Sequence, residues 1–113
     1  MAIAIPSRLN GVANSASLHE QGEKSVGAAT VQLVSSPLAC SFVWVGAPTA
    51  NHTVGEANTG NILIGKESTG NASGGMVLAA TDTKGFLILC NDASKLFLTG
   101  FNAGDVVEYQ IWI

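Results

Sequence analysis

Two histidines are the side chains of this 113-residue sequence that ordinarily exchange protons near neutral pH. His19 is followed by Glu20 in a polar stretch, and His52 lies in the loop-like segment APTANHTVGEANTG. A hydrolase would need one of them beside a nucleophile and an orienting carboxylate, but the sequence has no nucleophile-elbow motif. A small hydrolase using His19 or His52 is kept as an alternative, and we expect the protein not to be an enzyme.

The segment GNILIGKE at residues 60–67 has the spacing of a phosphate-binding loop, with Gly60, Gly65 and Lys66 in place. However, Glu67 stands where such a loop has serine or threonine for magnesium, and Ile-Leu-Ile in the middle is typical of a strand. A carboxylate at this position would also repel bound phosphates. We therefore expect a strand ending in a turn, and no cofactor.

Cys40 and Cys90 are the only cysteines and lie 50 positions apart, in the apolar runs LACSFVWV and GFLILC. Two buried free thiols and a disulfide both fit this pattern. A structural zinc site needs four ligands, usually with close pairs such as Cys-x-x-Cys, and no such pair is present. We expect no metal site.

Charged side chains are scarce, because five basic and eight acidic residues make up only 12% of the chain, about half the usual share. Residues 25–55 contain none at all. The basic residues are scattered singly and the net charge is −3, which excludes electrostatic binding of nucleic acid. Either the surface is polar but neutral, or part of it is covered by other protein chains.

The neutral stretch does not predict a membrane helix, since Gln32, Pro37 and Pro48 interrupt the roughly 20 apolar residues that such a helix needs. The first residues, MAIAIPSRLNG, lack the basic and long apolar regions of a secretion signal. We expect no membrane partner and synthesis in a cytoplasm.

The positions of the candidate residues depend on strands rather than helices. No window of about 11 residues keeps the apolar spacing of a helix, so no long helix is expected. Short β-rich runs between Gly, Asn, Ser and Pro clusters predict an all-β fold, a small antiparallel β-sandwich or barrel of jelly-roll-like form. We predict an N-terminal arm or loop over 1–28 and a β-sandwich domain over 29–113. The strands are expected near residues 2–5, 29–34, 39–46, 61–65, 76–80, 85–90, 95–99 and 105–112.

Two local patterns are the clearest. FLILC-NDAS-KLFLT predicts a hairpin that turns at Asn91 and Asp92, whose side chains can bond nearby backbone amides. The final strand alternates, so one set of side chains should face the core and the other set should face outward. The inward set is Val107, Tyr109, Ile111 and Ile113, and the outward set is Val106, Glu108, Gln110 and Trp112.

The strand at 39–46 is apolar on both faces, which predicts burial by the core on one side and by the N-terminal segment or a partner chain on the other. One face carries Cys40, Phe42 and Trp44, and the other carries Val43 and Val45.

From about Thr30 onward, the order of sequence pieces resembles a group of small capsid-associated proteins of tailed bacteriophages. The resemblance covers about three quarters of the chain and excludes the N-terminal 28 residues. Members with an assigned role are capsid decoration or cement proteins, small all-β units that are often trimers on the outer face of the head. The matching pieces are TVQL, ACSFVWV, NTGNILIG, GGMVL, DASKLFLTG and AGDVVEYQIWI.

This resemblance implies a structural virion protein, made in the host cytoplasm, that binds the outer capsid surface and clamps neighbouring major capsid subunits. Its partners would be the major capsid protein and sister copies in a homotrimer. For each residue expected at the interface, Trp112 included, the alternative is burial within the monomer. The alternative function is a carbohydrate- or receptor-binding β-module of a phage tail or fibre. The residues expected at the protein interface are Leu9, Val12, Leu18, Val43, Val45 and Trp112.

Overall fold

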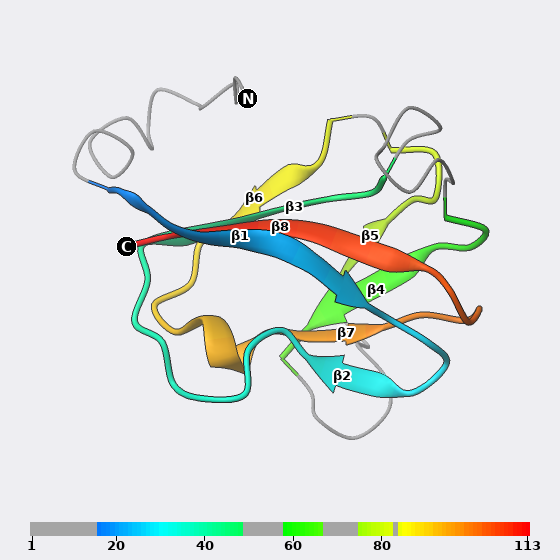
Figure 1. The fold of residues 1–113 in the computed structure, drawn as a ribbon, viewed down its shortest axis with the longest axis horizontal. Helices are drawn as coiled ribbons and strands as arrows, with labels where there is room; N and C mark the ends of the chain where they lie inside the picture. The colour runs from blue at the N-terminus through cyan, green and yellow to red at the C-terminus, as the bar shows by residue number, and fades with distance from the viewer. Residues whose placement is uncertain (1–15, 49–57, 67–74, 83) are drawn as a thin grey trace.

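The computed structural model describes residues 16–48, 58–66, 75–82 and 84–113. These residues form eight β-strands and a three-residue 3-10 helix (Figure 1). No helix within the described ranges is long and apolar enough to cross a bilayer. The elements are β1 (Leu18–Ser25), β2 (Thr30–Gln32), β3 (Phe42–Gly46), β4 (Ile62–Gly65), β5 (Met76–Leu78), β6 (Phe86–Ile88), η2 (Ala93–Lys95), β7 (Phe97–Thr99) and β8 (Val106–Trp112).

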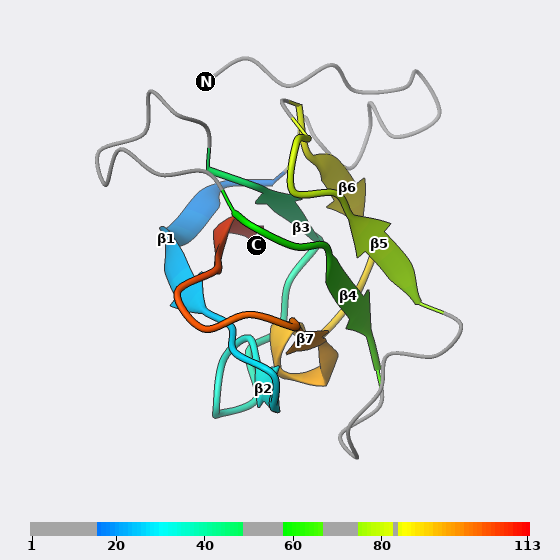
Figure 2. The ribbon, with the colours of Figure 1, turned by 90° about the vertical axis from the view of Figure 1, so that its right-hand side faces the viewer.

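The strands form two four-stranded sheets, which we call sheet A (β1-β8-β3-β6) and sheet B (β2-β7-β4-β5). All pairings are antiparallel, and every connection except β4–β5 crosses from one sheet to the other. This is the strand order of an eight-stranded jelly roll. Figure 2 shows the two sheets on opposite sides of the interior. The predicted all-β antiparallel fold is confirmed.

Seven predicted strands correspond to β2 through β8, and the one expected at 2–5 lies outside the described residues. The alternation predicted for β8 is confirmed at its centre, because Val107 and Ile111 are fully buried and Tyr109 packs against the core. Ile113, which was also expected to face inward, is exposed just beyond the end of the strand.

The core is made of aliphatic side chains from the inner faces of both sheets. Val43 and Val45 belong to it and have no exposed surface, because they lie opposite the inward-facing Ile111 and Tyr109 of β8. The prediction that these two valines face a partner was therefore wrong. The other face of β3, which carries Phe42 and Trp44, is the outer one.

The N-terminal stretch is less separate than predicted, because residues 18–25 form β1 and pair with β8 along its length. The expected boundary at residue 28 therefore separates β1 from the other three strands of sheet A. This strand was missed because its sequence, LHEQGEKS, is polar and mostly exposed on both faces. Charged side chains on an edge strand are a common protection against unwanted strand pairing.

The predicted hairpin around Asn91 and Asp92 was also wrong. β6 pairs with β3 in sheet A, whereas β7 pairs with β2 and β4 in sheet B. The connection is a crossover that contains η2, and Asp92 caps this helix by accepting a hydrogen bond from the Ser94 amide. The same carboxylate oxygen accepts from the Leu38 amide, which ties the crossover to the segment before β3.

Candidate interaction face on sheet A

The outer face of sheet A begins with an apolar row that runs across three strands. Trp112 of β8 lies opposite Leu18 of β1 on one side and Phe42 of β3 on the other. The rings of Phe42 and Trp112 stack, with centroids 5.5 Å apart and planes inclined by 18°. Leu18 is 43% exposed, so the row ends in an accessible apolar side chain. Leu18 and Trp112, two residues predicted to contact a partner, are thus neighbours.

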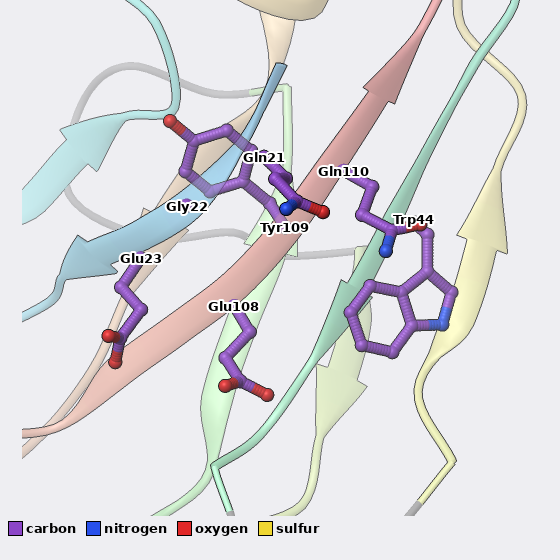
Figure 3. A pocket seen from close by; sticks show the side chains of 7 residues that line it. All are labelled: Gln21, Gly22, Glu23, Trp44, Glu108, Tyr109 and Gln110. Atoms are coloured by element: carbon purple, nitrogen blue, oxygen red, sulfur yellow. The ribbon is translucent and has the colours of Figure 1, made fainter. Parts of the chain in front are cut away.

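The next row along this face is amide-rich. Gln21 of β1, Gln110 of β8 and Trp44 of β3 are successive cross-strand partners. They line a shallow groove of about 310 Å³, which Figure 3 shows from close by. Gln110 Oε1 accepts a hydrogen bond from Trp112 Nε1 at 3.3 Å, which links the amide row to the apolar row.

Two carboxylates form the third row. Glu23 of β1 and Glu108 of β8 lie directly opposite each other, and Figure 3 shows both carboxyl groups on the same side of the sheet. Residues directly opposite in an antiparallel pair have closely spaced side chains, so the negative charge is concentrated at this end of the groove. The face therefore changes from apolar through neutral amide to acidic.

The indole of Trp44 is held in place by two glycines. A methyl group at Gly46 or Gly85 would collide with the ring, and Gly85 has a φ of +69°, which favours glycine. The indole Nε1 donates to the carbonyl oxygen of Lys84 at 3.2 Å. Trp44 is consequently buried at the wall of the groove and offers little ring surface to a ligand.

On the inner side of the same strands, the Tyr109 hydroxyl donates a hydrogen bond to Glu20 Oε2 at 2.7 Å. Burial raises the pKa of Tyr109 to about 12, and its hydrogen bond to the Glu20 carboxylate acts in the same direction. This contact joins β1 to β8 beneath the outer face.

The other predicted site residues are dispersed. His19 is exposed at an irregularity in the register of β1, where it lines a second hollow together with Glu20 and Lys24. Leu9, Val12 and His52 lie outside the described residues. Ile62–Gly65 is strand β4, as expected for a segment that is not a phosphate-binding loop.

The sequence pattern does not indicate Gln21 and Glu23, because the polar segment that forms β1 is predicted to be part of an arm. Their partners Gln110 and Glu108 were found on the outward face of the last strand by simple alternation. Recognising the edge strand would have required knowledge of what β8 pairs with, which no local pattern provides.

Comparison with known proteins finds no matching family model, and no significantly similar curated protein or solved structure.

Proposed function

We propose that this protein is a structural virion component that binds the outer surface of a phage capsid through the outer face of sheet A. In that role it clamps neighbouring major capsid subunits as a decoration, or cement, protein. The observation that carries the proposal is the cross-strand row in which Leu18 and Trp112 lie side by side. It supports a contact surface because an exposed leucine and a partly exposed tryptophan adjoin on the outer face of the sheet.

Three further features support the proposal. The resemblance of residues 30–113 to capsid-associated proteins names the class of partner. Jelly rolls are frequent among viral capsid domains, although the fold alone does not define a function. The scarcity of charge, with none in residues 25–55, suits a chain that works in contact with other proteins.

The proposed action is mechanical. A protein that binds the assembled shell better than loose subunits stabilises the shell by mass action. In a homotrimer, three copies of the face would engage several capsid subunits, and each later contact would become effectively intramolecular. Moderate affinity per face is then sufficient for stable attachment.

The test of attachment is co-sedimentation of the purified protein with heads that lack it. Replacing Leu18 by glutamate places a charge in the proposed contact, and we expect bound copies to fall by roughly tenfold or more. The matched control is Val77→Glu, because Val77 is also an apolar strand residue, 54% exposed, but lies on sheet B. Equal binding by the two variants would remove sheet A from the proposal.

Copy counting by mass spectrometry of intact virions tests the function itself. A decoration protein should be present in numbers comparable to those of the major capsid protein. Absence from virions would overturn the proposal. Analytical ultracentrifugation of the free protein tests the homotrimer separately.

A carbohydrate- or receptor-binding module of a phage tail or fibre is the second candidate. The groove between Gln21, Gln110 and the two glutamates supports it, because amides and carboxylates are suitable partners for sugar hydroxyls. The buried ring of Trp44 counts against it, since the groove then lacks an open aromatic platform. Only a few copies per virion, with glycan binding that is lost in Gln21→Ala, would favour this candidate over the first.

A further inference from the structure

The two cysteines lie against each other at one end of sheet A. Their sulfur atoms are 3.4 Å apart, and Cys40 Sγ is also 3.2 Å from the carbonyl oxygen of Cys90. A disulfide has a sulfur–sulfur distance of about 2.05 Å, so bond formation requires a closing movement of only about 1.4 Å. Both side chains are partly exposed, which leaves them accessible to a small reagent.

The backbone holds this pair in register. Ala39 and Asp92 form an isolated antiparallel bridge, and the Cys40 amide donates to the Asn91 carbonyl oxygen at 3.2 Å. The Leu38 amide is bound by the Asp92 carboxylate at 3.1 Å. On the other side of the thiols, β3 and β6 pair from Val43 and Ile88 onward. The two segments are therefore joined on both sides, and the thiols stay neighbours in the reduced protein.

We propose that Cys40 and Cys90 form an intramolecular disulfide when the folded protein meets a small-molecule disulfide of the glutathione type. This inference does not depend on capsid binding, and either proposal can fail without the other.

The reaction is two successive thiol–disulfide exchanges. The Cys40 thiolate attacks one sulfur of glutathione disulfide, which forms a mixed disulfide on Cys40 and releases one glutathione thiolate. The Cys90 thiolate then attacks the Cys40 sulfur, which forms the internal bond and releases the second glutathione. The two cysteines lose two protons and two electrons, and the glutathione disulfide takes them up as two thiols.

The reduced pair is protected from fast oxidation by its surroundings. Burial raises the pKa of the Cys40 thiol, although its hydrogen bond with Cys90 acts in the opposite direction. Burial raises the pKa of Cys90 to about 12, and its hydrogen bond with Cys40 adds to the effect. The negative charge of the Asp92 carboxylate also raises the pKa of both thiols. Because the thiolate is the reactive form, Cys40 is the better attacking group and exchange becomes faster as the pH rises.

The bond would join the segment before β3 to the segment after β6 and close a loop whose ends are 50 positions apart. This loop passes through both sheets, since it contains β4 and β5 of sheet B. Closing a long loop reduces the conformational entropy of the unfolded chain, so the oxidised protein should melt about 10 °C or more above the reduced one.

The experiment uses the full chain, purified with a reductant, transferred to buffer without it and incubated with glutathione disulfide at about pH 9. We expect an intact mass two hydrogen atoms below that of the reduced chain, loss of both free thiols and a rise in the melting temperature. The controls are Cys40→Ser and Cys90→Ser, each of which should stop at one mixed disulfide with glutathione and show no such rise.

Three results would overturn the inference: a protein that keeps both thiols, one that carries two glutathione molecules, or one that forms only disulfide-linked dimers. If a serine variant fails to fold, the comparison of oxidised and reduced wild-type protein still decides the question through mass and melting temperature.

Discussion

The side chain of Asn58 forms two hydrogen bonds with the backbone of Val106. Its Nδ2 donates to the Val106 carbonyl oxygen at 2.8 Å, and its Oδ1 accepts from the Val106 amide at 2.9 Å. The buried Asp105 carboxylate next to it accepts from the amides of Thr59 and Gly60 at 2.9 and 3.0 Å. The Asn-Thr-Gly segment at 58–60 and the Gly-Asp turn at 104–105 thus bind each other and fix the entry to β8.

Replacing Asn58 by alanine should destabilise the protein by about 2–3 kcal/mol, because both backbone groups of Val106 would lose a partner. Urea denaturation measures the change. The matched control is Asn91→Ala, since Asn91 is exposed, and its effect should stay within about 0.5 kcal/mol. Equal effects of the two substitutions would mean that the Asn58 amide contributes nothing specific.

Gly85→Ala should cost about 2 kcal/mol or more and disturb the wall of the groove. Its φ of +69° strains any residue with a Cβ, and the added methyl would meet the Val45 carbonyl oxygen and the Trp44 indole. Thermal melting and tryptophan fluorescence report the two effects. Gly27→Ala serves as the control, because a Cβ there meets nothing within 4 Å. Normal stability of Gly85→Ala would contradict the described packing of Trp44.

Stability should fall as the pH rises from about 10 to about 12, in part because of Tyr109. The pKa of this tyrosine is raised by burial from its ordinary value near 10 to about 12 in the folded protein, so the unfolded chain loses the proton first. The stabilising contribution is complete below pH 10 and disappears as the pH passes 12.

The measurement is the difference in stability between wild type and Tyr109→Phe across this pH range, since Cys90 also has a pKa of about 12 and affects both proteins. Tyr109 is the only tyrosine, so the absorbance of tyrosinate reports its ionisation directly. Ionisation near pH 10 in the folded protein would show that the ring and its bond to Glu20 are not protected as described.

Two N-terminal deletions distinguish the role of residues 1–16 from that of β1. Removing residues 1–25 deletes the strand that pairs with β8, and we expect an aggregating or largely unfolded product because the β8 edge becomes open. Removing residues 1–16 keeps β1 together with the paired backbone groups of Ser17 and Ile113. This shorter deletion should retain the β-sheet circular dichroism of the full chain.

Co-sedimentation with heads then tests whether residues 1–16, which include Leu9 and Val12, contribute to attachment as predicted for an arm. Weaker binding by a folded protein supports the arm. Unchanged binding would assign attachment to the remaining chain alone, and unfolding of the shorter deletion would place the segment in the core.

The sequence by itself determined the fold class, seven of the strands and the two faces of the last strand. These features follow from local rules, because turn residues interrupt the chain and alternation within a strand sorts side chains by face. It also predicted Trp112 on the outward face of this strand, together with Glu108 and Gln110, while leaving burial within the monomer open as the alternative. The unusual lack of charge was visible from composition alone.

Only the tertiary structure decided which strands pair. Pairing placed Leu18 beside Trp112 and Glu23 beside Glu108, assigned Val43 and Val45 to the core, and separated β6 from β7. Because β3 is apolar on both faces, its local sequence does not indicate which face is inward. The polar strand β1 can be identified as a strand only from its pairing with β8. Sheet register joins residues far apart in the chain, so it depends on how the two sheets bury their inner faces against each other rather than on any short stretch of sequence.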